Sequence, residues 1–439
     1  MTSTNRLLIR TEWEHKPLEE ERDLASIGIF AGGQILTRLL DLQTSQTRDF
    51  FRASAVSLAL WMADNWWRLR WEPIADYNLP DADWRLRHEL TSAAGGTNWP
   101  PLMIYGVGDR VVLAPISVTD FSSGPIEYLR QPVTIIPGSE FESGLDVFFA
   151  TVLAACVQAK DIAVLASVVA QLARERGDQE IAAWRRLEAR LGYDADKAPD
   201  NVIERLSKIE ERVGVEAVEE AATSNPSPSA PEVLEKVIEA SQASDAIVDL
   251  EAAMSVTDAG FRSDGVRPIW MVAEDAATRL RTKIGYPTGP LRNRIMGDTL
   301  RANWKRIMEA TPTARKLPYG ARLQNRNSTQ NIALQTTKSH DRRFELARVL
   351  GDAIWMRQAD FGVISRGKTD RQKFQRAFAQ SLLCPFEDLR QHINRLAPTS
   401  VEIAAAARYY HVHVSVVQNL LINKGILPRE TLGEHLEAA

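Results

Sequence analysis

The 439-residue sequence has very little cysteine and no long apolar segment. Its two cysteines, Cys156 and Cys384, lie far apart and have no potential metal ligands beside them. This excludes a disulfide scaffold and a Cys-rich zinc module, and it suits a reducing compartment. No apolar run reaches the roughly 18–20 residues of a membrane helix, so we expect no membrane partner. The first residues lack an apolar stretch with a small-residue cleavage site. We therefore expect no secretory signal and a cytoplasmic protein.

Common enzyme motifs are also lacking. The sequence contains neither a Gly-x-x-x-x-Gly-Lys-Ser/Thr phosphate-binding loop nor a Gly-x-Ser-x-Gly nucleophile elbow. Of the seven histidines, only His411 and His413 lie close together, and no third ligand accompanies them. An ordinary turn explains this pair, and a loop position explains His340. We therefore expect no metal and no other cofactor.

The formal net charge of −4 is unevenly distributed along the chain. Residues 265–439 contain 28 Lys and Arg against 15 Asp and Glu, a net charge of +13, which leaves −17 for the remainder. Such an asymmetry has three explanations: attraction between the two halves, an acidic partner such as nucleic acid, or uneven solvation of two domains. The sequence leaves all three open.

Composition divides the chain into successive regions of different character. We expect a mainly α protein with small β elements (α+β) and several domains. Apolar helical spacing predicts a helix within 50–71, and short β-like runs follow at 101–107, 110–118 and 132–138. The six tryptophans between Trp61 and Trp99 are expected in the core of this first domain. The expected regions are a Trp-rich α+β domain (1–140), a helical region (141–222), a Ser/Pro linker (223–232), an acidic helical connector (233–264) and a basic C-terminal domain (265–430).

The C-terminal region contains, in order, AEDAATRLRTKIGYPTGPLRNRI, QNIALQTT, RRFELARVLGDAIW, FQRAFAQSLLCP and TSVEIAAAARYYHVHVSVVQNLLINKG. In this order and spacing the segments resemble the ImmA/IrrE family of bacterial metallopeptidase-like domains, over about 266–429. The resemblance implies a zincin-like domain with a helix–loop–helix, a strand, a central helix, a following helix and a helix–turn–helix-like tail. The N-terminal region resembles an uncharacterised region of bacterial proteins that end in such a unit, and this second likeness implies no chemistry.

The positions that carry chemistry in that family are replaced here. A zincin holds zinc with two His one helical turn apart and a downstream Glu, and a Glu beside the first His activates the bound water. Alignment places Arg348 at the first His, Val349 at the general base, Asp352 at the second His and Gln372 at the third ligand. Arginine does not ligate zinc, and one carboxylate does not make a catalytic zinc site. Because Arg348 and Asp352 are spaced i, i+4, we expect them to face each other as an ion pair at the vacant metal position.

Basic residues are concentrated at the start of this domain. The segment from Arg292 to Arg326 contains nine basic and two acidic residues, and Trp304 and Tyr319 lie within it as potential stacking groups. A second cluster spans Arg366 to Arg376. The tail pair at 401–409 and 415–424 is poor in Arg, so we expect a structural role for it rather than DNA reading. The candidate nucleic-acid contacts are Arg292, Arg294, Arg301, Lys305, Arg306, Arg315 and Lys316.

The leading interpretation is a catalytically inactive ImmA/IrrE-like protein that works by binding. The family cleaves or controls repressors and antitoxins in mobile-element, stress and phage-defence settings. The resemblance therefore implies a protein partner, such as a regulator, an antitoxin or toxin, or a phage-defence component. Two alternatives stay open: a DNA-binding regulator that uses the basic C-terminal unit, and a hydrolase with an atypical site.

Overall fold

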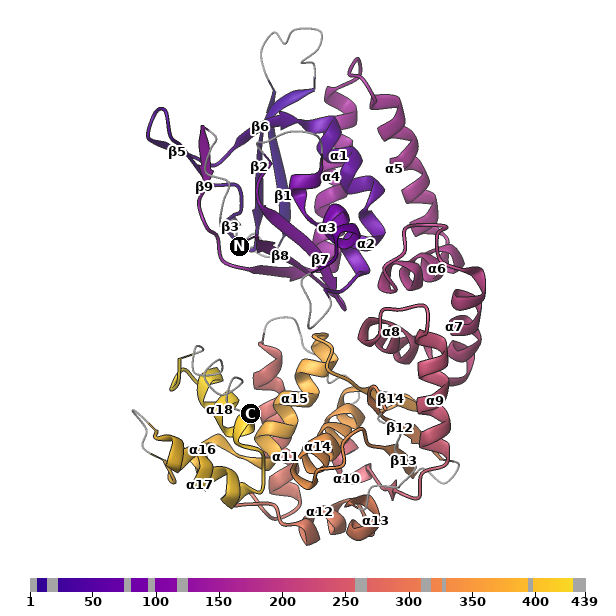
Figure 1. Cartoon of the computed structure of the whole chain (residues 1–439), viewed down its shortest axis with the longest axis vertical. Helices are drawn as coiled ribbons and strands as arrows, with labels where there is room; N and C mark the ends of the chain where they lie inside the picture. The colour runs from indigo at the N-terminus through magenta and orange to yellow at the C-terminus, as the bar shows by residue number, and fades with distance from the viewer. Residues whose placement is uncertain are drawn as a thin grey trace. The chain divides into compact units, whose positions relative to one another are not determined.

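The computed structural model describes residues 6–13, 23–74, 80–93, 99–116, 125–256, 267–308, 317–325, 329–393 and 398–428. The chain divides into two compact units, one of residues 1–204 with 225–228 and the other of residues 205–224 with 229–439. Helices predominate over strands in both units (Figure 1), which confirms the mixed, mainly helical fold. The two units are described separately.

The first unit contains three small antiparallel sheets. Alternation of buried and exposed side chains builds β1, whose Leu7 and Ile9 point into the core, and β1 pairs along its whole length with β2. The predicted strands at 101–107, 110–118 and 132–138 are confirmed as β7, β8 and β10, which form one sheet. The strands are β1 (Leu7–Trp13), β2 (Leu24–Ala31), β3 (Gln34–Ile35), β4 (Leu39–Asp41), β5 (Gln46–Arg48), β6 (Phe51–Ser54), β7 (Leu102–Val107), β8 (Arg110–Pro115), β9 (Ile126–Tyr128) and β10 (Thr134–Pro137).

The helix expected within 50–71 starts later and is broken. Phe51–Ser54 pair with β2 as strand β6, and the Ser54 hydroxyl then caps α1 by accepting from the Ser57 amide. Asn65 separates α1 from α2. The predicted helical region after residue 141 is confirmed. The helices are α1 (Ala55–Asp64), α2 (Trp66–Trp71), α3 (Ala82–His88), α4 (Gly138–Ala155), α5 (Ile162–Gly177) and α6 (Gln179–Arg190), with a short 3-10 helix at Leu90–Ser92. Helix α7 (Asp200–Val213) begins in this unit, and its residues from 205 onwards belong to the second unit.

The tryptophans of this unit are core residues, as predicted. Trp61, Trp66, Trp67 and Trp99 are buried in one apolar cluster that also contains side chains of β1, β2, α1 and α4. Trp84 is buried as well, and Trp71 packs against the same cluster. The residues that gave this region its aromatic character therefore stabilise the unit and do not form an exposed ligand platform.

The Ser/Pro segment 223–232 contains more helix than we expected. Helix α8 (Val215–Ser224) ends inside it, and α9 (Ala230–Gln242) begins inside it with Pro231 in its first turn, a position that suits proline. The acidic segment 233–264 also differs from a connector, because its strand β11 (Ile247–Val248) pairs with β13 of the second unit. The second unit therefore starts well before residue 265, and residues 257–266 lie outside the described part of the chain.

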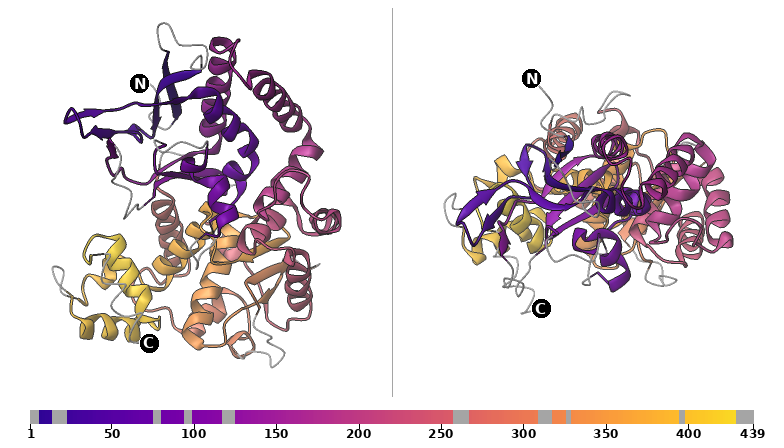
Figure 2. Two further views of the ribbon diagram at one scale, coloured as in Figure 1. Left: turned by 45° about the horizontal axis from the view of Figure 1, so that its top comes forward. Right: turned by 90° about the horizontal axis from the view of Figure 1, so that it is seen from above.

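The second unit is built around an antiparallel sheet in the order β11-β13-β12-β14. Arg322 and Gly362 are register partners that face α14, whereas their neighbours Ala321 and Val363 point to the other face. Figures 1 and 2 show the sheet between α14 and α9, and α15 packs against α14. The strands are β12 (Gly320–Gln324), β13 (Gln330–Ala333) and β14 (Phe361–Ile364).

Helices account for most of this unit. The helix pair at its start, the central helix, the following helix and the tail pair were all predicted and are confirmed as secondary structure. Strands β12 and β14 were not predicted, because each is short and carries few apolar residues in alternation. The remaining helices are α10 (Glu251–Met254), α11 (Ile269–Lys283), α12 (Asn293–Thr299), α13 (Trp304–Met308), α14 (Ser339–Trp355), α15 (Asp370–Leu383), α16 (Phe386–Leu389), α17 (Ser400–Tyr410) and α18 (Val414–Asn423).

Candidate functional site

Arg348, Val349, Asp352 and Gln372, the four positions that the family resemblance aligns with a zinc site, lie where α14 packs on α15 and on the sheet. We call these positions and their contacts the degenerate centre. Arg348 and Val349 are adjacent in α14, Asp352 lies one turn later, and Gln372 lies in the first turn of α15. Thr369 caps α15 by accepting a hydrogen bond from the Gln372 amide, which fixes where this helix begins. Val349 is fully buried in the apolar core, so the position of the general base belongs to the hydrophobic interior.

Asp352 is the centre of a buried ionic network. Its Oδ2 accepts from Arg322 Nε at 2.7 Å, and its Oδ1 accepts from Arg371 Nε at 2.7 Å. The Gln375 amide donates to the same Oδ1 at 2.7 Å. The Asp352 side chain has no exposed surface, and those of Arg322 and Arg371 are only 1% and 7% exposed. Both carboxylate oxygens are therefore occupied by charge-assisted hydrogen bonds.

Ion pairing decides the charge of this carboxylate. Burial raises the pKa of Asp352, but Arg371 and Arg322 outweigh burial and hold the pKa below its usual range. Burial lowers the pKa of Arg322, and Asp352 opposes that effect. The group functions as a carboxylate locked between two guanidinium ions.

Arg322 also joins the network to the loop that follows α14. Its Nη1 donates to the Ala359 carbonyl at 3.0 Å, and its Nη2 donates to the Met356 carbonyl at 2.9 Å. A Cβ at Gly362 would lie 1.9 Å from Asp352 Oδ2 and 2.7 Å from Arg322 Nε. Because glycine has no Cβ, Gly362 leaves room on this face of β14 for the ion pair between Asp352 and Arg322.

The expected ion pair between Arg348 and Asp352 does not form. Arg348 Nη2 instead donates to the Ser365 carbonyl, to Gln372 Oε1 at 2.6 Å and to Gln375 Oε1 at 3.1 Å. The two residues do share α14, and Gln375 bridges them. The reason is that β12 and α15 bring two other arginines to Asp352, while carbonyl and amide oxygens surround the Arg348 guanidinium.

Burial of Arg348 disfavours its charged form, although the guanidinium stays protonated near neutral pH. Burial, with Arg376 nearby, lowers the pKa of Arg348 to about 9. The buried Nε of Arg348 and Nη2 of Arg371 have no hydrogen-bond partner among the described residues. Each of these two guanidinium groups therefore has one buried nitrogen donor without an acceptor among the described residues.

Side chains of this centre also form hydrogen bonds with backbone groups of β14 and of Ser365, which follows it. Gln372 Nε2 and Gln375 Nε2 both donate to the Val363 carbonyl, at 2.9 and 3.0 Å. The Ser365 amide donates to Gln372 Oε1 at 3.0 Å. An additional strand therefore cannot pair with β14 at this point unless these side chains move.

The donor set of the centre does not suit zinc. Asp352 is the only carboxylate among the four aligned positions, and both of its oxygens are bound by cations. In the described part of the chain, no group of three or more His, Cys, Asp and Glu is arranged to hold a metal ion. His413 lies at the N-cap of α18 beside Ser415, and His411 ends α17 in a left-handed conformation with φ 55°.

The basic segment 292–326 is only partly available for binding. Arg292, Arg294, Arg301, Lys305 and Arg306 are exposed, whereas Arg315, Lys316 and Arg326 lie outside the described residues. Arg294 is within 3.8 Å of Asp298, and Arg301 pairs with Asp249 at 3.1 Å. For Arg292, Lys305 and Arg306 the described residues provide no ion-pair partner.

The other features expected to contact nucleic acid mostly belong to the interior. Tyr319 is 2% exposed, and Trp304 packs against the core, so Tyr319 is not an accessible stacking group. Arg371 of the second basic cluster is buried on Asp352. In the tail, Lys424 binds Glu274 at 2.8 Å, and Tyr410 donates to Asp388 at 2.8 Å. These contacts agree with a structural role for the α17–α18 pair.

Sequence reasoning missed three members of the network. Arg322 was counted in the basic segment, and Arg371 in the second basic cluster. Gln375 was not singled out, although it lies one helical turn after both Arg371 and Gln372. That spacing was the one signal in the sequence that could have placed Gln375 on the same face of α15.

The comparisons with known proteins add no relative. The chain matches no protein-family model, no curated protein and no solved structure. The likeness to the ImmA/IrrE family therefore rests on the sequence segments quoted above. The described helices contain no segment that is long and apolar enough to cross a membrane.

Proposed function

We propose that this chain is a catalytically inactive ImmA/IrrE-like protein that acts as a binding or regulatory module for a protein partner. The partner would be a regulator, an antitoxin or toxin, or a phage-defence component. One observation carries the proposal: the position aligned with the second zinc ligand is Asp352, whose carboxylate is buried between Arg322 and Arg371.

The chemistry of the centre argues against peptide cleavage. A zincin needs three protein ligands, an open metal position and a base next to the bound water. Here the aligned residues are a bound carboxylate, a glutamine, an arginine and a buried valine. Removal of a proton from water requires a basic group, and the aliphatic side chain of Val349 contains none. Within the described residues, no group of three or more His, Cys, Asp and Glu could hold a metal ion for a metal-dependent hydrolase.

The β14 edge also gives little support to binding by strand addition. Gln372 and Gln375 of α15 already hold the Val363 carbonyl, and Arg348 holds the Ser365 carbonyl. A partner would have to break these buried bonds in order to add a strand. Recognition of the partner is therefore assigned to another surface of the chain.

A second candidate function, contact with nucleic acid, is favoured by one observation. Arg292, Lys305 and Arg306 are exposed near α12 and α13 without a described ion-pair partner. Such cations can neutralise phosphates, and the resulting affinity falls steeply with salt. The buried Tyr319 and the internal position of Arg371 remove two of the features that made this function attractive.

The experiment is recovery of the tagged full-length chain from its native cells, with and without a metal chelator, followed by mass spectrometry of what co-purifies. The proposal predicts an intact protein partner in fixed ratio to the chain, recovered equally with and without chelator. Nuclease treatment should leave this recovery unchanged.

Two results would contradict the proposal. A partner recovered as fragments without chelator, and intact with it, would indicate metal-dependent cleavage. Material that nuclease treatment releases completely would favour the nucleic-acid alternative.

A further inference from the structure

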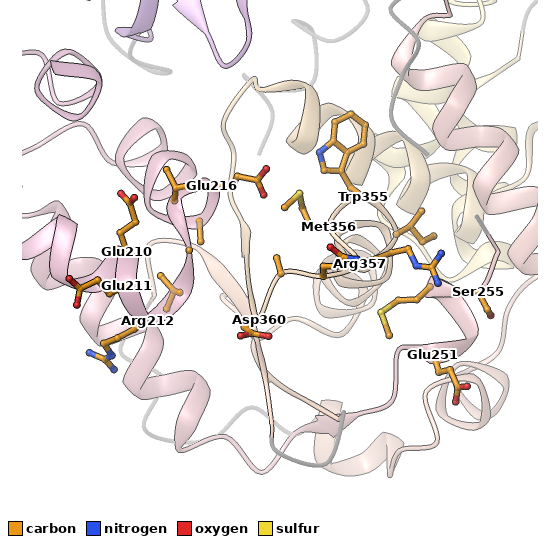
Figure 3. A pocket seen from close by; sticks show the side chains of 18 residues that line it. Glu210, Glu211, Arg212, Glu216, Glu251, Ser255, Trp355, Met356, Arg357 and Asp360 are labelled. Carbon is orange, nitrogen blue, oxygen red and sulfur yellow. The ribbon is translucent and has the colours of Figure 1, made fainter. Parts of the chain in front are cut away.

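A cleft with a volume of about 990 Å³ opens in the second unit. One side is formed by the end of α7 and the start of α8, over residues 210–217. The facing side is the end of α14 with the loop that follows, over 354–360, and α10 contributes Glu251, Met254 and Ser255. Figure 3 shows these side chains around the opening. We call it the α7–α14 cleft. Its volume is at the upper end of the roughly 300–1,000 Å³ of ligand-binding pockets.

Apolar side chains line part of this cleft. Val213, Ile354 and Met356 are buried, Met254 and Trp355 are half-buried, and Val215 is 40% exposed. The Trp355 ring is held by Phe374, with ring centroids 5.1 Å apart. Two methionines and a tryptophan form a surface that adapts to apolar side chains of a ligand.

The polar lining of the α7–α14 cleft is predominantly acidic. It contains five acidic residues and two basic ones, a net formal charge of −3. Of the acidic residues, Glu211, Glu216, Glu251 and Asp360 are exposed. This contrasts with the excess of positive charge in residues 265–439. The acidic residues are Glu210, Glu211, Glu216, Glu251 and Asp360, and the basic ones are Arg212 and Arg357.

The degenerate centre holds both sides of the cleft in place. Arg322, fixed by Asp352, donates to the carbonyls of Met356 and Ala359 in the loop after α14. On the other side, Glu220 of α8 accepts from the Thr369 hydroxyl at 2.9 and 3.0 Å. The network that replaces the metal site thus positions two walls of a neighbouring cleft.

We propose that the α7–α14 cleft binds a cationic segment of a protein partner, in which Lys or Arg side chains accompany apolar ones. The inference rests on the proposed function and names the chemistry of its partner. The acidic lining attracts the cations and disfavours phosphate groups, and the apolar lining takes up the remaining side chains. A short segment of this composition matches both halves of the lining.

The test uses the full-length chain and a fluorescently labelled twelve-residue peptide of alternating lysine and leucine. A glutamate–leucine peptide of the same length and spermine serve as ligands of different chemistry. The rim variant Glu211→Lys/Asp360→Lys reverses one exposed charge on each side of the cleft. The matched control, Glu239→Lys/Asp275→Lys, makes the same charge change at exposed positions on α9 and α11.

Fluorescence anisotropy should show saturable binding of the lysine–leucine peptide and none of the glutamate–leucine peptide. The rim variant should weaken binding by about tenfold or more, because two attractions become repulsions. The control should change the affinity by less than about twofold, since exposed distant charges are screened. Val215→Ser should also weaken binding, because it removes an exposed apolar contact.

Three results would overturn the inference: no binding to the wild-type chain, equal weakening by rim and control variants, or spermine binding as tightly as the peptide. The outcome is separable from that of the proposed function. If the rim variant still recovers an intact native partner at the wild-type level, the cleft assignment is wrong and the proposed function stands. Metal-dependent cleavage of the partner would instead contradict the proposed function.

Discussion

Asp352 holds two buried guanidinium groups in the interior of the second unit, because Arg322 and Arg371 both pair with its carboxylate. A buried charge that loses its partner is strongly destabilising, whereas exposed pairs contribute little. The exposed pair between Arg267 and Asp275, with atoms 2.6 Å apart, provides a comparison within the same unit.

Asp352→Asn should lower the free energy of unfolding of the second unit by about 3–5 kcal/mol, because it leaves Arg322 and Arg371 without a counter-charge. Asp275→Asn should cost less than about 1 kcal/mol. Urea unfolding, with hydrogen exchange of the α14 amides as the local reporter, measures both values. Equal, small effects of the two substitutions would contradict the ionic network.

The contribution of Asp352 should also depend on pH in a defined direction. Its pKa in the folded protein lies below the ordinary value of 3.8, so its stabilisation is complete above that value and is lost as the pH falls through the folded pKa. The stability difference between wild type and Asp352→Asn should therefore be constant near neutral pH and shrink below about pH 4. Burial raises the pKa of Glu345, which acts in the opposite direction in both proteins and cancels in the difference. A difference that grew on acidification would contradict the assignment.

At the scale of elements, the close approach of β14 and α14 depends on Gly362. Its missing Cβ leaves the space through which Asp352 reaches Arg322. By contrast, a Cβ at Gly177, at the end of α5, would meet no atom within 4 Å.

Gly362→Ala should therefore destabilise the second unit by about 1–3 kcal/mol, as expected for an overpacked interior. Gly177→Ala should be neutral or stabilise by up to about 1 kcal/mol, because alanine is the better helix residue. Thermal unfolding of the two variants beside wild type is the measurement. An unchanged melting temperature in Gly362→Ala would mean that β14 and α14 are not held this closely.

The sequence predicted elements better than it predicted contacts. Segments 342–355 and 374–385, which the family resemblance predicted as helices, lie in α14 and α15. Apolar helical spacing, which is local information, likewise predicted the helix within 50–71. Strands β12 and β14 are four or five residues long and are defined by nonlocal pairing, β12 with both β13 and β14. Arg322 illustrates the same limit, since the sequence only groups it with the basic segment 292–326, and it is the sheet that places it against Asp352.

The family resemblance aligned Arg348, Asp352 and Gln372 with metal ligands, and the structure places these three residues on α14 and α15, but their interactions differ from the expected ones. The i, i+4 spacing of Arg348 and Asp352 favoured a local pair. The structure instead satisfies Asp352 with residues 30 and 19 positions away in the sequence, because a buried carboxylate needs donors on both oxygens. The spacing of residues on one helix does not show which residues from other elements bind Asp352 in place of Arg348.

At the scale of the whole molecule, the uneven distribution of charge bears on whether the chain binds a protein partner or DNA. Attraction between acidic and basic parts of the chain is one of the three explanations of this asymmetry, and Arg301 of the basic segment does pair with Asp249 of the acidic segment. A test of DNA binding requires the full chain. A fragment of residues 261–439 would lack α8, α9, α10 and β11, which belong to the second unit.

The full chain should bind DNA weakly, and Lys305→Glu/Arg306→Glu should change that affinity by less than about twofold at moderate salt, where weak non-specific contacts are screened. Electrophoretic mobility shift at two salt concentrations is the measurement. A tenfold loss in the variant, together with a steep salt dependence in the wild type, would favour the DNA-binding alternative over a protein partner.

The most direct test of the central claim, that a buried ionic network stands where a zincin would hold its metal, is the zinc content of the full-length chain. The protein is saturated with zinc, freed of loosely bound ions by gel filtration and measured by elemental analysis. The account predicts far less than one zinc per chain, with no change in Asp352→Ala. One zinc per chain that is lost in both Asp352→Ala and Gln372→Ala would contradict it.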